Sequence, residues 1–562
     1  MKYSRWSIKP KAPQSIIDQI GMPPVESTIL FNRGLFSKTE ATDFITPLET
    51  DLHDPYLLPD MGKVINRLTI ALKTNEIIGV FGDFDTDGLS GTALLTKSIQ
   101  FLGGTVIPYV PHRTSEGHGV SLKAIDYFIT KNVTLMVTVD CGVTSINEIA
   151  LANKSGIDTI VTDHHIPLEK FPDAVGIVNA HLENSKYPFK DLTGVGVAFK
   201  VIEALYDSYK KEIPEEIYAF CALGTLSDVG LMESENRYIV HKGIDVMRNT
   251  EILGIDALIN QGNLSKKELT TEDLSFGIIP RLNVASRLEH ANTSLQLLLS
   301  SSKSQADQIA KHLDKLNKQR QLITEKAMLE ANNQVEASKH NGETNILFAG
   351  KPNWTPGILG LVAGQLAEAY YRPAIAVSGQ GNLLRSSARS IPEFNMIEAL
   401  QSCGDIFEQF GGHSMAAGFT IKRENLKRFR EIISSISNEI LAAVPKGPEL
   451  LIDAEITPNW LNQETMHFLS SLEPYGNGNS TPKFITKNVT VVSAKKVGRS
   501  GSHLKLSISH NQNVYEAIAF RQGNRINETK NMLDIAYTAK INSWNGKKTI
   551  QLTIDDFKPS NE

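Results

Sequence analysis

Residues Ile77–Gly88 read IIGVFGDFDTDG, and this stretch decides the fold. The apolar run Ile77–Phe81 predicts a buried β-strand, and a helix is predicted from about residue 90 to residue 102. Three acidic side chains stand where the strand passes into the helix: Asp83, Asp85 and Asp87. Because three neighbouring carboxylates repel one another unless a cation binds, the segment predicts a metal site. A calcium-binding DxDxDG loop is excluded, since its twelfth position requires a carboxylate and is Leu94 here.

Two further strand ends carry side chains that bind metals. Asp140 follows the apolar run Leu135–Val139, and the triplet Asp163–His165 follows the run Thr159–Thr162. A further carboxylate, Asp228, ends an apolar helix. The carboxyl ends of parallel strands meet at one edge of a sheet, so we expect these groups to form one cluster. Carboxylate and imidazole ligands suit Mn²⁺, Mg²⁺ or Zn²⁺, and their number is sufficient for two ions that share a carboxylate.

The apolar pattern predicts an α/β multidomain chain in five parts. Short apolar runs that alternate with helical periods predict two α/β domains, the first with a mostly parallel sheet. A long charged stretch with helical spacing predicts a helical connector between them. The last part holds five or six short strand-like runs, which is typical of a β-barrel of the oligonucleotide-binding kind. The predicted parts are a lead-in at 1–60, an α/β domain at 61–240, the connector at 241–340, an α/β domain at 341–445 and the barrel at 446–562.

The composition fits a globular chain with an uneven charge. The 562 residues carry 57 Lys+Arg and 62 Asp+Glu, and the net charge is −5. From residue 481 onward there are 13 basic and 6 acidic residues, which leaves +7 on this last stretch of the chain and −12 on the rest. No apolar run reaches the roughly 18 residues of a membrane span, and Cys141, Cys221 and Cys403 form no CxxC pair. We expect a cytoplasmic protein without a membrane partner, with buried reduced thiols and a barrel that binds a polyanion.

The order of these motifs resembles that of the DHH phosphoesterases. Further segments narrow the resemblance to the RecJ family within that group: Pro111-His112-Arg113, Gly194-Val195-Gly196, Pro280-Arg281-Leu282-Asn283, Ser387-Ala388-Arg389-Ser390 and Gly411-Gly412-His413. The resemblance runs from about Trp6 to the last predicted strand. It implies a DHH domain, a DHHA1 domain and a C-terminal OB-fold. It also implies a single-strand-specific 5′ to 3′ DNA exonuclease of DNA repair and recombination, which uses two divalent ions, Mn²⁺ or Mg²⁺, and releases 5′-mononucleotides.

The resemblance also assigns roles to single residues. Five side chains would hold the metal ions, with the third shared between both ions: Asp83, Asp85, Asp140, His164 and Asp228. Four others would take part in catalysis: His165, Asp163, Asp87 and His413. His165 would face the scissile phosphate, and Asp87 would be a metal ligand or would orient one. Among these, Asp163 would orient the histidine pair by hydrogen bonding. His413 would contact the substrate phosphate from the DHHA1 domain.

A further set would bind the strand and its terminal phosphate: Arg113, Arg281, Arg287, Ser387, Arg389, Gly411 and Gly412. Guanidinium groups suit this task because each can grip a phosphate with two hydrogen bonds. Taken alone, each arginine could equally form a surface ion pair. Ser286 stands where the family more often has glycine, so the choice between Arg281 and Arg287 stays open.

The expected substrate is single-stranded DNA with a 5′ end, supplied to a monomeric enzyme by a helicase and a single-strand-binding protein. In the barrel, Tyr515, Phe520 and Trp544 could stack on bases or fill the core. A small-substrate DHH phosphodiesterase, of the oligoribonuclease or cyclic-dinucleotide type, is the main alternative, and the basic barrel argues against it. A non-catalytic DNA-binding DHH protein is a second alternative. It is disfavoured because every motif position keeps a metal-binding side chain.

Overall fold

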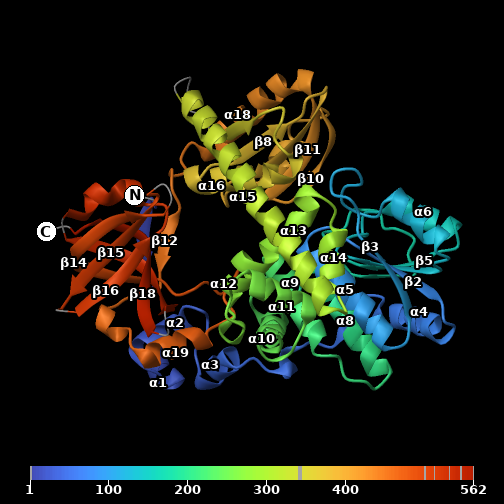
Figure 1. Ribbon diagram of the computed structural model, residues 1–562, viewed down its shortest axis with the longest axis horizontal. Coiled ribbons are helices and arrows are strands. Elements are labelled where there is room, and N and C mark those ends of the chain that lie inside the picture. Colours follow the sequence, from blue (N-terminus) through green and yellow to red (C-terminus); the bar gives the residue numbers. More distant parts are fainter. Residues whose placement is uncertain are drawn as a thin grey trace. The chain divides into compact units, whose positions relative to one another are not determined.

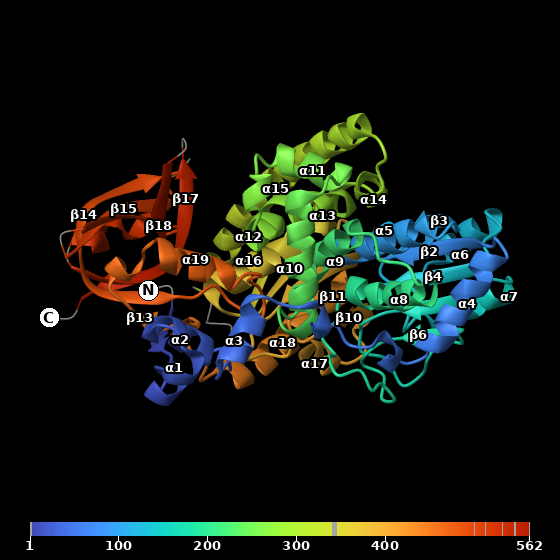
Figure 2. The same ribbon diagram turned by 90° about the horizontal axis from the view of Figure 1, so that it is seen from below.

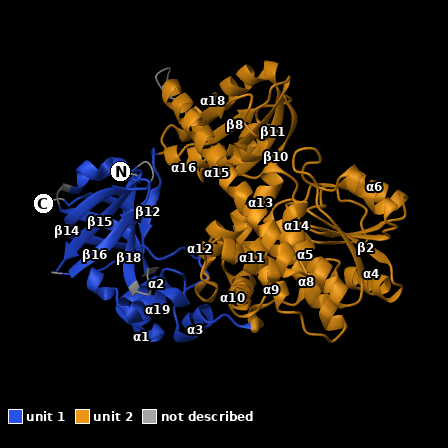
Figure 3. Ribbon diagram, in the orientation of Figure 1, with its two compact units in different colours: residues 1–48, 445–475, 479–562 blue, residues 49–444, 476–478 orange. Residues whose placement is uncertain are grey.

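The computed structural model describes residues 3–339, 345–498, 501–511, 513–530, 532–544 and 547–560. The chain folds as two compact units, which Figure 3 colours separately. Unit 1 joins three stretches: Met1–Leu48, Pro445–Tyr475 and Asn479–Glu562. Unit 2 holds the remainder: Glu49–Val444 and Gly476–Gly478. None of the described helices combines the length and the apolar character that a membrane crossing requires.

The first lobe of unit 2 is built on a five-stranded parallel sheet (Figure 1). Its strand order is β3 (Thr105–Tyr109), β2 (Ile77–Gly82), β4 (Leu135–Val139), β5 (Asp158–Thr162) and β6 (Gly176–Val178). The helices of this lobe are α4 (Met61–Lys73), α5 (Thr86–Phe101), α6 (Leu122–Thr130), α7 (Ile146–Lys154) and α8 (Gly194–Ser208). The mostly parallel sheet predicted from the sequence is confirmed.

Alternate residues of the central strands serve two cores, because successive side chains of a strand point to opposite faces. Val80 of β2 joins the large core that includes residues of α4, α5 and α8. Phe81 joins the cluster with Phe128 of α6 and Ala152 of α7. Helices therefore cover both faces of the sheet, and the ends of the strands are the places left for a site.

A helical connector follows this lobe, and its first two helices begin before residue 241, where the sequence places the start of the connector. Its helices are α9 (Glu216–Ser227), α10 (Ser234–Asn249), α11 (Leu253–Gln261), α12 (Thr271–Asp273), α13 (Ile279–Leu288), α14 (Asn292–Leu298) and α15 (Lys303–Lys339). A π-helical turn, Leu274–Ile278, leads into α13, and Pro280 lies in the first turn of that helix, where no backbone N–H is needed. The 37-residue helix α15 packs along α11 and α13 and then continues to the second lobe.

The second lobe of unit 2 has a mixed sheet. Its strand order is β10 (Phe407–Gly412), β11 (Ala416–Lys422), β9 (Leu383–Arg389), β8 (Ala374–Ser378) and β7 (Leu347–Gly350). Only the pair β7 and β8 is parallel. The helices are α16 (Leu359–Tyr370), α17 (Met396–Gln401) and α18 (Leu426–Leu441). The second predicted α/β domain is thus present.

Unit 1 contains the predicted barrel, at the red end of the chain in Figure 2. Its five strands, in order, are β14 (Phe484–Val497), β15 (His503–His510), β16 (Asn513–Ala519), β18 (Lys547–Pro559) and β17 (Leu533–Trp544). Pairing between β14 and β17 closes the barrel. Phe520 is 48% exposed, whereas Tyr515 packs against the core and donates to Asn459 at 2.8 Å. The side chain of Trp544 lies outside the described side chains.

The first 48 residues belong to the same unit as the barrel. Strand β1 (Arg5–Ile8) pairs in parallel with β12 (Glu449–Ile452), more than 440 residues later in the chain. Three short helices follow: α1 (Gln14–Ile20), α2 (Pro24–Phe31) and α3 (Lys38–Ile45). Ile20 and Leu30 from these helices share a core with Leu461 and Met466, which precede the barrel. The N-terminal segment is therefore an integral part of the barrel unit.

Candidate active site

An acidic loop connects β2 to α5. Asp83 follows the strand, and its side chain is buried. Asp85 caps the helix: its Oδ1 accepts the backbone N–H groups of Asp87 at 3.0 Å and Gly88 at 3.3 Å. Aspartate is well suited to this position because the first N–H groups of a helix have no partners within the helix. The second Asp of the loop is thus fixed by local backbone geometry.

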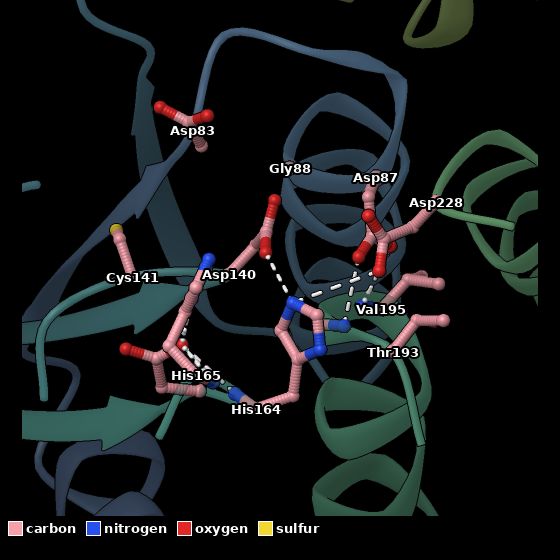
Figure 4. A network of polar contacts seen from close by, with 12 residues as sticks. Asp83, Asp87, Gly88, Asp140, Cys141, His164, His165, Thr193, Val195 and Asp228 are labelled. Carbon is pink, nitrogen blue, oxygen red and sulfur yellow. Dashed lines mark hydrogen bonds and ion pairs between the residues drawn. The ribbon is translucent and has the colours of Figure 1, made fainter. Parts of the chain in front are cut away.

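Asp87 is held by the start of a second helix (Figure 4). Its two carboxylate oxygens accept the backbone N–H groups of Gly194 at 2.8 Å and Val195 at 2.9 Å, in the first turn of α8. A side chain at Gly194 would come within 2.4 Å of the Cβ of Asp140, so glycine is required where α8 approaches the strand end. This contact explains the glycine at position 194.

Asp140 lies directly after β4 with φ at 60°. Aspartate is among the residues that adopt this left-handed conformation most readily. Its Oδ1 lies 3.0 Å from Nε2 of His164, and the same nitrogen lies 3.8 Å from Oδ2 of Asp228 (Figure 4). Two carboxylates from different elements therefore converge on one imidazole nitrogen.

Asp163 organises the histidine pair. Its Oδ1 accepts the N–H groups of His164 at 2.8 Å and His165 at 3.1 Å, and lies 2.7 Å from the ring Nδ1 of His165. Its Oδ2 accepts the N–H of Val143 at 2.9 Å. With these contacts Asp163 orients the imidazole of His165 and fixes the backbone from which the His164 ring extends.

The carboxylates of the cluster are electrostatically stressed. Burial raises the pKa of Asp85, Asp87 and Asp140, and repulsion from neighbouring aspartates raises it further. Partial burial and the charge of Asp85 raise the pKa of Asp228 to about 7. Such a group of buried acids is stable in its charged form only with a compensating cation.

The two histidines have opposite tendencies. Burial and the neighbouring His165 lower the pKa of His164 to about 3, so its ring stays neutral and can act as a ligand. Burial also opposes a charge on His165, but the hydrogen bond and the charge of Asp163 prevail and raise its pKa to about 9. His165 is therefore protonated on both ring nitrogens, and so positively charged, at neutral pH.

The donor set fits a divalent metal. Three overlapping groups each place their ligand atoms within 4.8 Å of one another: Asp83 with Asp85 and Asp140, Asp140 with His164 and His165, and Asp87 with His164 and Asp228. Oδ1 of Asp83 is buried and has no hydrogen-bond partner among the described residues. A buried carboxylate oxygen without a donor is costly unless a cation lies beside it.

His118 joins the cluster, and sequence reasoning assigned it no role. Its Nδ1 lies 3.1 Å from Oδ2 of Asp83, and its ring centre lies 4.4 Å from that of Phe84. The available signal was its place in the segment after β3, at the sheet edge where the other candidates lie.

Predicted phosphate-binding residues form a second cluster in unit 2. Arg113 lies over the ring of Phe84 at 4.5 Å, and Nη1 of Arg389 donates to Oγ of Ser387 at 3.2 Å. Burial, with repulsion from Arg113, Arg320 and Arg389, lowers the pKa of Arg287 to about 9. No ion pair to any of these four arginines occurs in the described part of the chain. The arginine cluster, which we define as Arg113, Arg287, Arg320 and Arg389, therefore has no carboxylate ion-pair partner among the described residues.

Arg281 and Arg320 differ from expectation in opposite directions. Arg281 forms an ion pair with Asp314 of α15 at 2.8 Å and donates to the carbonyl of Gly277. Among the described residues, no hydrogen bond joins Arg281 to a member of the arginine cluster. Arg320, which was not predicted, comes from α15, and its buried Nε has no hydrogen-bond partner within the described residues. Of the two alternatives left open by the sequence, Arg287 is the one beside the other arginines.

The glycine-rich segment of the second lobe reaches the metal cluster through one histidine. The ring of His413 stacks on that of His165, with the centres 5.7 Å apart. Gly411 and Gly412 end β10, and Gly412 has φ at 142°, where a side chain would collide with the carbonyl of Ala416. The tight turn at this strand end places His413 beside the first lobe.

Three family models match consecutive parts of the chain. The DHH family N-terminal domain matches residues 77–225, the DHHA1 domain matches 343–439 and the RecJ OB domain matches 452–556. Together they cover the first lobe, the second lobe and the barrel. The matches show a DHH domain followed by a DHHA1 domain and an OB-fold domain.

Whole-chain comparisons agree. The chain is 32% identical to the single-stranded-DNA-specific exonuclease RecJ of Bacillus subtilis over 97% of its own length and 69% of that protein, and 32% identical to the RecJ of Haemophilus influenzae over 91% and 92%. RecJ from Thermus thermophilus, solved with Mn²⁺, matches 99% of this chain and 80% of its own at a TM-score of 0.84 and 26% identity. The same Thermus protein was also solved with Mg²⁺. On these matches and the site geometry, the chain belongs to the RecJ family of DHH phosphoesterases.

Proposed function

We propose that this chain is a metal-dependent exonuclease that degrades single-stranded DNA from the 5′ end and releases 5′-mononucleotides. The observation that carries the proposal is the presence, in one unit, of an acid and histidine cluster fit for divalent metals and an arginine cluster that forms no ion pair among the described residues. The first cluster suits hydrolysis of a phosphodiester, and the second suits a terminal phosphate.

We propose two divalent ions, Mn²⁺ or Mg²⁺, held by Asp83, Asp85, Asp140, His164 and Asp228, with Asp140 shared between them. Bound ions would activate a water and neutralise charge on the phosphate. The three ligand groups overlap at Asp140 and His164, which supports a shared position. Asp87 is engaged by two backbone N–H groups, so we assign it to orienting the loop.

In this proposal His165 and His413 contact the phosphate of the substrate. Asp163 accepts a hydrogen bond from Nδ1 of His165, so the protonated Nε2 remains available to donate to a phosphate oxygen. His413 stacks on that ring and supplies a second polar group from the other lobe. Gly411 and Gly412, which have no side chains, would let the DNA strand approach the backbone at the end of β10.

The arginine cluster is assigned to the 5′ phosphate. Replacing Arg389 by alanine is expected to weaken binding of a 5′-phosphorylated strand about 10- to 100-fold, since a hydrogen bond to a charged group contributes about 1.5 to 3 kcal/mol. Binding of the same strand with a 5′-hydroxyl should change little. The measurement is fluorescence anisotropy of both strands, with Arg423→Ala as control, because Arg423 binds only backbone carbonyls of its own lobe in the recorded contacts. Equal weakening of both strands would contradict the assignment.

The function itself is tested with labelled DNA. Single strands labelled at the 5′ end should yield labelled mononucleotide at the earliest times with Mn²⁺, and strands labelled at the 3′ end should shorten gradually. Excess chelator should stop both reactions, and blunt duplex DNA should resist. Mononucleotide released first from the 3′ end would refute the proposed direction. Faster turnover of cyclic dinucleotides or short oligoribonucleotides would favour the small-substrate alternative.

We further propose that the enzyme works as a cytoplasmic monomer in DNA repair and recombination, on strands supplied by a helicase and a single-strand-binding protein. The barrel would hold the strand by charge and by stacking on Phe520, which is exposed and lies 5.4 Å from the ring of His503. A non-catalytic role is disfavoured by the complete metal-ligand set.

A further inference from the structure

One side chain of helix α13 contacts the acidic loop between β2 and α5, which we call the metal-binding loop from here on. Oδ1 of Asn283 accepts the N–H of Thr86 at 2.9 Å, between Asp85 and Asp87. Nδ2 of the same side chain lies 3.4 Å from Oγ of Ser227, the residue before Asp228. An amide side chain offers an acceptor and a donor at once, so Asn283 links two segments that carry candidate ligands.

One turn further along, α13 contacts the arginine cluster. Oγ of Ser286 accepts Nη1 of Arg113 at 3.2 Å and donates to the carbonyl of Asn283 at 3.1 Å. Ser286 is 3% exposed. The next residue, Arg287, is itself a member of the arginine cluster. Because residues three apart lie on one side of a helix, Asn283 and Ser286 share a face that spans the two clusters.

We propose that Asn283 and Ser286 are positioning residues: Asn283 orients the metal-binding loop, Ser286 orients Arg113, and α13 fixes the distance between the metals and the bound strand end. The inference rests on the proposed function, and it adds residues to which no role was assigned above. Three residues of helix rise about 4.5 Å, and a helix turn deforms little.

The test uses two variants of the full chain and two binding measurements. Asn283→Ala is expected to weaken Mn²⁺ binding about tenfold, as loss of an orienting partner of metal ligands does, and to leave the preference for a 5′-phosphate over a 5′-hydroxyl unchanged. Ser286→Ala should lower that preference about threefold to tenfold, the effect of one lost hydrogen bond, and leave Mn²⁺ binding unchanged. Free Mn²⁺ is followed by electron paramagnetic resonance without DNA, and strand binding is followed in chelator. The control is Asn332→Ala. Asn332 lies on the C-terminal part of α15, where its side chain accepts a hydrogen bond from the hydroxyl of Tyr370 in α16.

The outcomes separate the inference from the proposed function. If Asn283→Ala binds Mn²⁺ as the wild type does, or Ser286→Ala keeps the full preference, the inference is overturned. The same holds if both variants shift both measurements equally, because that is the pattern of a general structural defect. If a urea titration shows that Asn283→Ala is not folded, Ser227→Ala is measured in its place. This variant removes the hydroxyl that accepts from Asn283 and should also weaken Mn²⁺ binding. If the crossed pattern holds but the wild type releases no nucleotides, the positioning roles stand and the proposed function falls.

Discussion

Replacing Asp140 by asparagine is expected to slow single-strand hydrolysis about a thousandfold at saturating Mn²⁺. Asp140 is the carboxylate common to two of the three ligand groups, so its charge acts on both proposed ions. Losing about 4 kcal/mol of electrostatic stabilisation corresponds to that factor. Asparagine is preferred to alanine because it tolerates the left-handed backbone at this position and keeps an oxygen facing His164. The measurement is the initial rate of mononucleotide release.

Asp158 provides the matched control for this substitution. It begins β5 at the opposite end of the same sheet and forms a surface ion pair with Arg67 at 2.7 Å, so Asp158→Asn should change the rate less than about twofold. Undiminished hydrolysis by Asp140→Asn would remove Asp140 from the metal site. An equal loss in both variants would mean that the sheet, and not the ligand, is responsible.

Thermal unfolding of Asp140→Asn shows whether the charge of Asp140 stabilises or destabilises the metal-free protein, which the rate of hydrolysis does not. The pKa of Asp140 is raised in the folded protein, so its ionisation opposes folding at neutral pH, and this penalty disappears as the pH falls and the group binds its proton. The neutral asparagine should therefore be at least as stable as the wild type in chelator. Mn²⁺ should raise the midpoint of the wild type, because it binds the folded state, and should raise that of the variant much less.

The strand-end aspartates were predictable because their positions follow from local rules. Parallel strands that end after short apolar runs bring their next residues to one edge, which is how Asp83, Asp140 and Asp163 come together. Asp85 is fixed by helix capping, which is again a local effect. The sequence was therefore sufficient for the candidate metal cluster, with the exception of His118.

The arginine cluster was only partly predictable because it depends on packing between distant elements. Arg281 and Arg287 are six residues apart on one helix, so they face different directions, and only the position of α15 decides which of them meets Arg113 and Arg389. Arg320 lies on a charged helix whose exposed and buried positions share the same residue types. Likewise, nothing local in β1 indicates pairing with β12, since that contact spans most of the chain.

Removing unit 1, by expressing residues 49–444 alone, is expected to weaken binding of a long single strand and to spare hydrolysis of a very short oligonucleotide. Every candidate site residue lies within this fragment, whereas the basic excess of +7 lies after residue 480. Each lost phosphate contact lowers the salt dependence by about 0.7, so three or four contacts would reduce the slope of log affinity against log salt by about 2 to 3. Affinity is measured by anisotropy over a range of salt concentrations.

A second fragment, residues 1–444, tests whether the N-terminal segment belongs with the barrel in folding. A cut near residue 447, chosen from the sequence boundaries, would leave Ile20, Ile29 and Leu30 without Leu461 and Met466, with which they share a core. Exposed apolar surface of this kind promotes association, so 1–444 should aggregate where 49–444 stays monodisperse in light scattering. Within unit 2 the shorter fragment loses contacts of residues 476–478, among them two hydrogen bonds of Asn477: its carbonyl accepts the N–H of Met232 at 2.7 Å, and its Nδ2 donates to the carbonyl of Val229 at 3.2 Å. Each contributes about 1 kcal/mol. If 49–444 lost activity on the short and the long substrate equally, unit 1 would be needed for the catalytic unit to fold, and the barrel could not be assigned to strand binding alone.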